Sequence, residues 1–429
     1  MEQILLCLSL ALIVGLLMSR LAKKINLPAV TAYLITGLIL GPFFIGKIGL
    51  SGIGFNTLDQ VSSFNIVSQV ALGFIAFAIG NEFRMNDLKS MGKQAIIVGI
   101  LQAVITTIIV DIALVCLHMI RPNLISVSSA ITLGAIAAAT APAATLMVVR
   151  QYKAEGPLTK LLLMVVAIDD AVGLVLFSVS FGIANAIEMG TINVTSVIVE
   201  PLLEIVLSLI LGCVAGIVLN LLEVYFHSRS KRMSLAVAFV LLITGISMQE
   251  FDIGFVHCGF SLLLVCMLAG TVFCNVCDAS DELMDRLDRW TSPLNILFFI
   301  LSGAELDLNI LSNPLVLLIG IIYIIFRSVG KISGAYISCR MTHCSPNIQK
   351  HLGITLLPQA GVALGMALTA ANLSDGGVIR NVVLFSVLVY ELVGPTLTKR
   401  SLTAAGEINP EGRSSSRLKN EPKAGMNLN

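Results

Sequence analysis

Apolar runs of about 15–25 residues recur along nearly the whole chain, and each is long enough for a helix to cross a lipid bilayer. Of the 429 residues, 56% are hydrophobic and 12% are charged, whereas soluble domains carry roughly 25% charged residues. The runs lie at residues 4–19, 28–43, 64–81, 94–118, 126–149, 158–186, 196–222, 233–249, 254–273, 293–305, 315–338, 347–372 and 377–397. Because so much apolar surface needs lipid as its solvent, the sequence predicts an all-α polytopic membrane protein with about thirteen transmembrane helices.

Lysine and arginine are distributed unequally between alternate loops. One set of loops, together with the polar tail at 401–429, holds 22 of the 27 basic residues, and the opposite set holds only Lys47, Arg121 and Arg380. Basic residues are enriched in cytoplasmic loops. An odd number of crossings therefore predicts an N-terminus outside and a C-terminus in the cytoplasm. We expect an integral protein of a bacterial inner (plasma) membrane with a disordered cytoplasmic tail.

Two short segments recur in opposite halves of the chain. Ile79–Asn86, at the end of the third run, resembles Ser302–Asn309 at the end of the tenth, and Leu40–Phe44 resembles Ala269–Phe273. Seven runs separate the partners, so the copies have opposite orientations, as in the inverted repeats of transporters. Short matches that contain glycine also arise by chance. The pattern favours two inverted-topology six-helix repeats.

The fifth and twelfth runs, which correspond in the two halves, are both interrupted by proline. The fifth contains Ala141 and Pro142, and the twelfth contains Pro358 and Gln359. Proline removes a backbone donor and disfavours helical geometry in the residue before it. A simple kink is one interpretation. Two breaks at matched places favour instead two crossed, unwound helices whose free backbone groups bind an ion at the middle of the membrane.

Asp169 and Asp170 lie side by side in the apolar stretch 161–177. Charged groups at membrane depth are rare and mark ion or proton paths. Neighbours on a helix point about 100° apart, so one carboxylate can face an ion cavity while the other faces a protein partner. Carboxylate oxygens are suitable ligands for Na⁺, and their protonation couples cation binding to pH. The structural alternative is that the pair caps a broken helix or neutralises a nearby cation.

Arg327 and Lys331 are the two basic residues that belong to neither set of loops, because they lie well inside an apolar run. They are four positions apart and therefore share one face of a helix. Snorkelling to the cytoplasmic end is one alternative, but Lys331 lies seven positions before Ser338, where the run ends. We therefore expect Lys331 to pair with one aspartate. Arg327 stays charged at every pH, and we expect it to hold the backbone carbonyls of the broken helices.

In their order along the chain, five segments resemble motifs of the sodium/proton antiporters in the cation:proton antiporter superfamily, in its paired-aspartate branch. Ala167–Leu174 is similar to the paired-aspartate motif, and Phe298–Leu308 to the stretch FFxxxGxxLDL. Arg327–Lys331 matches the RxxGK helix, Leu34–Pro42 resembles the GillGP span, and Tyr390–Pro395 resembles the closing tELxGP. The resemblance covers about residues 4–400.

This resemblance implies that Asp170 binds the cation and is alternately protonated, that Asp169 pairs with Lys331, and that Thr140 lies in the unwound ion-site helix. It also implies a homodimer in membrane lipid in which a core domain moves like an elevator. The dimerisation domain would comprise residues 1–92 and 229–310, the core 93–190 and 311–400, the linker helix 191–228, and the tail 401–429.

The resemblance further implies a secondary transporter that exchanges Na⁺, or Li⁺ or K⁺, for H⁺. Position 141 is Ala where relatives often offer a hydroxyl, and position 359 is Gln where some branches have Arg or Lys. These departures leave a K⁺/H⁺ antiporter, or a cation efflux channel of the same superfamily, as alternatives. If Lys331 also releases a proton when Na⁺ enters, two protons exchange for one Na⁺ and the cycle is electrogenic.

Nine cysteines are scattered through the chain and lack the pattern of a disulfide framework. Cys274 and Cys277 form a C-x-x-C, and Cys339 and Cys344 lie on the same predicted side of the membrane. A zinc or redox site is one interpretation and unrelated reduced thiols are the other; we expect no metal and no cofactor. The sequence has no P-loop, nucleophile elbow or zinc-protease motif, so we expect no enzyme, and no motif predicts a nucleic-acid partner.

Overall fold

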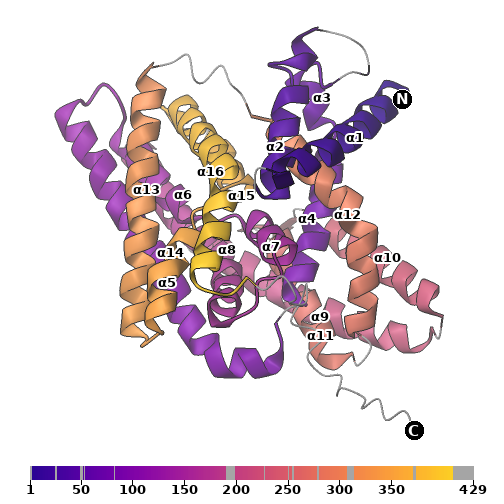
Figure 1. Cartoon of the computed structure of the whole chain (residues 1–429). Helices are drawn as coiled ribbons and strands as arrows, with labels where there is room; N and C mark the ends of the chain where they lie inside the picture. Colours follow the sequence, from indigo (N-terminus) through magenta and orange to yellow (C-terminus); the bar gives the residue numbers. More distant parts are fainter. Residues whose placement is uncertain are drawn as a thin grey trace.

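The computed structural model describes residues 2–24, 27–48, 52, 54–81, 83–189, 199–226, 228–249, 251–253, 256–277, 280–306, 314–370 and 373–408. The expected disordered tail after residue 408 and Asp307 of the FFxxxGxxLDL stretch lie outside these residues. The described chain is built almost entirely of helices, as Figure 1 shows. Helices are the expected solution because a backbone in lipid has to satisfy its polar groups within each segment.

The first half of the chain contains α1 (Glu2–Lys24), α2 (Ala29–Leu40), the short 3-10 helix η1 (Ile45–Ile48), α3 (Leu58–Ser62), α4 (Asn65–Gly80), α5 (Met85–Ile120), α6 (Val127–Ala138), α7 (Pro142–Gln151), α8 (Pro157–Met189) and α9 (Glu200–Val224). The second half contains α10 (Arg229–Ser247), the strands β1 (Phe251–Ile253) and β2 (Val256–Cys258), α11 (Leu262–Val276), α12 (Ser280–Ala304), α13 (Pro314–Met341), α14 (Pro346–Thr355), α15 (Gly361–Thr369) and α16 (Gly376–Ala404).

The predicted class, an all-α polytopic membrane protein, is confirmed. Among the described residues, nine helical segments are long and apolar enough to cross a membrane, and α4 and α11 are shorter apolar helices. The number of thirteen crossings and the inverted repeat stay predictions. Two helices start earlier than their apolar runs, α5 at Met85 and α12 at Ser280, because the helix continues through charged residues that water can solvate. The small antiparallel hairpin of β1 and β2 was not expected.

The helices pack as two groups, which lie mainly on the left and on the right of Figure 1. The crossover group consists of α5 to α8 and α13 to α16, in which α13 packs on α5, and α6 and α8 pack on each other. The flanking group consists of α1, α2, α4 and α9 to α12, in which α11 packs on α4 and α9, and α12 packs on α2. The groups meet where α16 and α7 contact α2 and where α8 contacts α9 and α11.

Glycines allow two pairs of flanking helices to approach closely. A Cβ on Gly37 of α2 would lie 1.9 Å from the carbonyl oxygen of Ile300 in α12. A Cβ on Gly80 of α4 would lie 1.8 Å from the carbonyl oxygen of Met267 in α11. Any larger residue would push these backbones apart. Close contact between small residues is how helices associate in lipid, where apolar burial adds little.

Both interrupted helices form at the predicted places. α6 ends at Ala138 and α7 begins at Pro142, where a missing N–H is harmless because the first turn has no intrahelical acceptor for it. α14 ends at Thr355 and α15 begins at Gly361, with Pro358 in the gap. The two unwound stretches cross, because the N–H of Ala141 donates to the carbonyl of Pro358 over 2.9 Å. The predicted pair of crossed, unwound helices is therefore confirmed.

The segment after α16 folds back onto the start of α8. The buried carboxylate of Glu407 accepts hydrogen bonds from the N–H groups of Leu158 and Thr159, each over 2.7 Å, and from the Thr159 hydroxyl over 2.7 Å. These N–H groups belong to the first turn of α8 and have no intrahelical acceptor. A carboxylate is also favoured there by the helix dipole. Glu407 therefore caps the helix that carries the paired aspartates.

We expect Glu407→Ala to lower the stability of the folded protein by about 2 kcal/mol, because it leaves the N-terminus of α8 without its cap. The melting temperature of the purified protein in detergent measures the effect. Thr159→Val is the matched control, since it removes one of the three bonds and should lower the melting temperature less. Equal melting temperatures for Glu407→Ala and the unmodified protein would contradict the capping role.

Candidate functional site

The end of α6 is held by the two cationic residues of α13. The guanidinium of Arg327 donates to the carbonyl of Ala137 over 3.0 Å, to that of Ala139 over 2.7 Å, and across to that of Leu357 over 2.7 Å. Arg327 has no exposed surface and lies over the ring of Tyr390, 4.4 Å from the ring centroid. The arginine therefore contacts both broken helices, which is the arrangement expected from the sequence.

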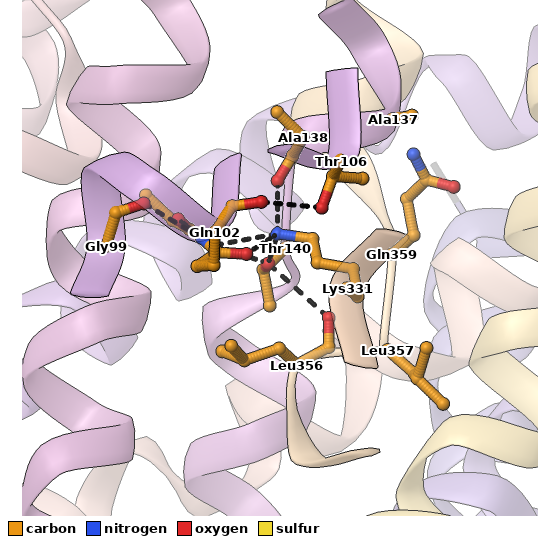
Figure 2. Close-up of polar contacts among 12 residues, drawn as sticks. Gly99, Gln102, Thr106, Ala137, Ala138, Thr140, Lys331, Leu356, Leu357 and Gln359 are labelled. Carbon is orange, nitrogen blue, oxygen red and sulfur yellow. Dashed lines mark hydrogen bonds and ion pairs between the residues drawn. The ribbon is translucent and has the colours of Figure 1, made fainter. Parts of the chain in front are cut away.

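Lys331, one helical turn further along α13, lies at the centre of a dense set of acceptors (Figure 2). Its ammonium group donates to the carbonyl of Ala138 over 2.5 Å, to the hydroxyl of Thr140 over 2.9 Å and to the amide oxygen of Gln102 over 3.0 Å. It also forms an ion pair with Asp169 over 3.0 Å. With Arg327 it supplies donors to three successive carbonyls at the negative end of the α6 dipole.

Asp169 is fully engaged by protein groups. One carboxylate oxygen accepts from Lys331 and, over 2.6 Å, from the hydroxyl of Thr140. The other accepts from the side-chain amide of Gln102, which lies on α5. Only 1% of Asp169 is exposed. A buried ion pair of this kind is stable because additional hydrogen bonds satisfy both partners. The ion pair between Lys331 and one aspartate, expected from the sequence, is present.

Asp170 points in a different direction from Asp169 and lines a cavity of about 670 Å³ between the two helix groups. Its carboxylate is only partly buried and accepts one long bond of 3.4 Å from the hydroxyl of Ser261, the N-cap of α11. The cavity wall includes the crossing residues Ala141 and Pro142 and, at the exposed rim, Asn65. The two neighbouring carboxylates therefore have different surroundings, one closed by protein and one open to the cavity.

Ala141 and Gln359, two of the residues expected at the unwound stretches, hold the two broken helices together. Ala141 offers its backbone N–H and no side-chain ligand. Gln359 is fully buried and donates to the carbonyl of Ile136 and to the hydroxyl of Tyr323, each over 3.1 Å, and accepts from Ser386 over 2.8 Å. Gln359 therefore stabilises the crossing and is not among the residues that line the cavity.

Sequence reasoning missed two polar contacts of the aspartates. Gln102 bridges Asp169 and Lys331, and Ser261 contacts Asp170. Gln102 is an amide side chain inside an apolar run, which is a detectable signal because such groups need partners in lipid. Ser261 gives no such signal, since a serine before a helix is an ordinary N-cap.

The four cysteines considered for a metal or redox site do not converge. Cys274 contacts backbone carbonyls of α4 and its own helix, and Cys277 contacts the carboxylate of Glu223 over 3.4 Å. Cys344, in the loop after α13, accepts from Gln94 over 3.0 Å. A hydrogen bond from the Cys339 thiol lowers the pKa of Cys344 to about 7. Within the described residues no three side chains of His, Cys, Asp or Glu gather closely enough to hold a metal ion.

Comparison with solved structures shows the same fold in a known antiporter. The sodium proton antiporter MjNhaP1 from Methanocaldococcus jannaschii, determined at pH 8, matches with a TM-score of 0.68 over 94% of this chain and 96% of that chain, at 17% identity. An electron-microscopy structure of the same antiporter matches with a TM-score of 0.71 over 94% of this chain and 98% of that chain, at 17% identity.

Curated relatives are antiporters as well. The K(+)/H(+) antiporter subunit KhtU of Bacillus subtilis (strain 168) is 21% identical over 401 residues, which cover 91% of this chain and 92% of the relative. The K(+) efflux antiporter 5 of Arabidopsis thaliana is 31% identical over 90 residues, or 21% of this chain and 14% of the relative.

A sequence model of the transmembrane sodium/hydrogen exchangers matches residues 8–403, almost the whole chain. The paired aspartates and the Arg327–Lys331 segment, two of the motifs that carried the resemblance, lie beside the two crossed, unwound helices. The chain is thus an integral membrane protein that belongs to the sodium/hydrogen exchanger family of cation/proton antiporters.

Proposed function

We propose that this protein exchanges a monovalent cation for protons across the membrane, and that Asp170 is the site for which the two compete. The observation that carries the proposal is the contrast between the neighbouring carboxylates. Asp169 is saturated by Lys331, Thr140 and Gln102, whereas Asp170 has one weak contact and faces the cavity. A cation that enters the cavity therefore meets Asp170 and not Asp169.

We assign Na⁺ as the transported cation, with K⁺ as the second candidate. The family name and the structural likeness to MjNhaP1 favour Na⁺, and the relative KhtU is named as part of a K⁺/H⁺ antiporter. The helix crossing supports neither ion in particular, because Ala141 offers no hydroxyl there and Gln359 is turned away from the cavity. Selectivity then rests on the carboxylates and on the water that stays with the ion.

Alternating access would proceed by movement of the crossover group against the flanking group. The cavity separates the groups at one end of the molecule, with Asn65 and Thr369 exposed at its rim. At the other end two contacts join them: Arg150 of α7 pairs with Asp288 of α12 over 2.9 Å, and Gln151 accepts from the N–H of Ala29 over 2.8 Å. With the orientation predicted from loop charges, this state is open to the outside.

In this proposal the crossover group is the mobile core and the flanking group the dimerisation domain of a homodimer. The core would then comprise 93–190 with 311–400 and the dimerisation domain 1–92 with 229–310, joined by the linker helix 191–228. The packing of α5 to α8 with α13 to α16 supports this division, whereas α9, in the linker range, packs on α11. An elevator movement of the core would break the Arg150–Asp288 contact and close the cavity above Asp170.

We expect Asp170→Asn to abolish cation-dependent proton flux, because an amide neither ionises nor exchanges a proton for a cation. Proteoliposomes loaded with a pH-sensitive dye and exposed in turn to Na⁺, Li⁺ and K⁺ measure the flux and also rank the cations. Size-exclusion chromatography checks that the variant is folded. Exchange by Asp170→Asn at the rate of the unmodified protein would exclude Asp170 as the shared site.

We expect Asp169→Asn to weaken exchange without abolishing it, and to lower stability by about 3–5 kcal/mol, because Lys331 stays buried without its counter-charge. Removing the charge as well, in Asp169→Asn/Lys331→Gln, should restore part of the melting temperature. This coupling between the two substitutions distinguishes an ion pair from two independent contacts. If the change in melting temperature of the double variant equalled the sum of the changes in the two single variants, the result would argue against an ion pair between Asp169 and Lys331.

We expect the exchange to move net charge because Lys331 releases a second proton when the cation binds. Each charge moved gains about 2.3 kcal/mol per 100 mV of membrane potential. Na⁺/H⁺ exchange in proteoliposomes whose potential is clamped should therefore change with the potential in the unmodified protein and become insensitive to it in Lys331→Gln. If the exchange rate of the unmodified protein did not depend on the potential, the proposed exchange would stand but would not be electrogenic.

A further inference from the structure

A second pair of carboxylates lies on the wall of the cavity, apart from Asp169 and Asp170. Glu391 comes from α16 in the crossover group, and Glu305 directly follows α12 in the flanking group. Both line the same cavity as Asp170. Glu391 is 4% exposed, whereas Glu305 is half-buried. The cavity is therefore bordered by acidic side chains from both helix groups.

Glu391 has an oxygen whose hydrogen-bonding capacity is unused. No hydrogen-bond partner for its Oε2 lies among the described residues, although this atom is shielded from the surface. Leaving a buried polar atom without a partner costs about 1–3 kcal/mol, and more for a charged group. A proton would remove the charge of Glu391, whereas a ligand in the cavity would also give the Oε2 atom a partner.

The charges around Glu391 identify the chemistry of that ligand. Glu391 and Glu305 interact electrostatically, and two nearby carboxylates repel unless a proton or a cation lies between them. The cavity wall also includes the carboxylates of Asp170 and Glu204. Its one basic residue among the described lining, Arg380, is exposed at the rim. Arg380 lies about 16 Å from Glu391 along α16, at 1.5 Å per residue.

The other positive charge near Glu391 is the guanidinium of Arg327, which already has hydrogen-bond partners. Arg327 lies over the ring of Tyr390, the neighbour of Glu391, but its guanidinium donates to carbonyls of both broken helices. It therefore serves the crossing. The two carboxylates therefore need a proton or a cation between them, and the described basic groups nearby do not supply the positive charge. Oxygen atoms are the ligands that hard cations prefer.

We propose that Glu391 and Glu305 form a second binding site for a monovalent cation, on the cavity wall and distinct from the exchange site at Asp170. The site rests on the proposed function only in that the cations reaching it are those offered for exchange. Because its two carboxylates belong to opposite helix groups, a bound cation favours the arrangement in which the cavity is open. A ligand that binds one arrangement better shifts the population toward it.

The test uses the variant Asp170→Asn, in which the exchange site is absent, so that binding at the second site is measured alone. A hydrophobic carbodiimide reacts with protonated carboxyl groups in apolar surroundings, so a bound cation that keeps Glu391 ionised slows the reaction, and peptide mass spectrometry gives the rate at Glu391. We expect Na⁺ or K⁺ to slow this reaction by about fivefold or more relative to choline at the same ionic strength and pH, as occupancy of most sites requires.

The protection should disappear in Asp170→Asn/Glu305→Gln, because one of the two ligands is lost. Asp170→Asn/Glu204→Gln is the matched control: it removes another cavity carboxylate, on α9, and should keep the protection. Equal rates in choline, Na⁺ and K⁺ would overturn the proposal, as would protection that survives the loss of Glu305. A Glu391 that reacts in none of the salts would show that the cavity does not reach it, with the same consequence.

Transport supplies an independent readout with Asp170 intact. We expect Glu391→Gln to raise the cation concentration for half-maximal exchange about tenfold while the maximal rate changes little. The reason is that cations bound at Glu391 and Glu305 pass from there to the exchange site at Asp170. Glu391→Asp, which keeps the charge, should recover most of the affinity. If the unmodified protein exchanged no cation, the proposed function would fail while the labelling experiment would still decide whether this site binds.

Discussion

The donors of α13 make it possible for two helices to end in the middle of a membrane. The carbonyls of residues 137–139 at the end of α6 have no intrahelical partner, and lipid offers no water to replace one. Arg327 and Lys331 donate to all three, and Arg327 also donates to Leu357 beside the second break. The dependence is mutual, since two buried cations need these acceptors as much as the carbonyls need donors.

This arrangement separates the tasks of the two aspartates. Lys331 requires a counter-charge, and Asp169 provides it. The carbonyls at the end of α6 already accept hydrogen bonds from two positively charged groups of α13, and these charges repel a transported cation. A cation in the cavity therefore depends on carboxylates, and Asp170 is the one placed beside the crossing.

The contacts between the two helix groups differ at the two ends of the molecule. At one end the groups are joined by the pairing of Arg150 with Asp288, which holds oppositely charged side chains directly together. At the other end two carboxyl groups, Glu391 and Glu305, come from opposite helix groups and line the same cavity. In the proposed cycle a cation bound between them favours the open arrangement.

The sequence alone determined the class of fold and most of the residues at the site. Helical spans follow from apolar length, the breaks follow from Pro142 and Pro358, and a lysine and two aspartates in apolar runs have no stable place in lipid except beside one another. From the residues alone the choice of aspartate stayed open, although the family resemblance implied Asp169, and the structure shows that Lys331 pairs with Asp169. Adjacent side chains on α8 differ by rotation about the helix axis, and that rotation is set by packing against α5 and α6. The sequence can mark Gln102 as a buried amide that needs a partner, but it does not say which partner. The contact of Ser261 with Asp170 and the position of Glu391 beside Glu305 also join helices far apart in the chain, and local periodicity carries no information about such contacts.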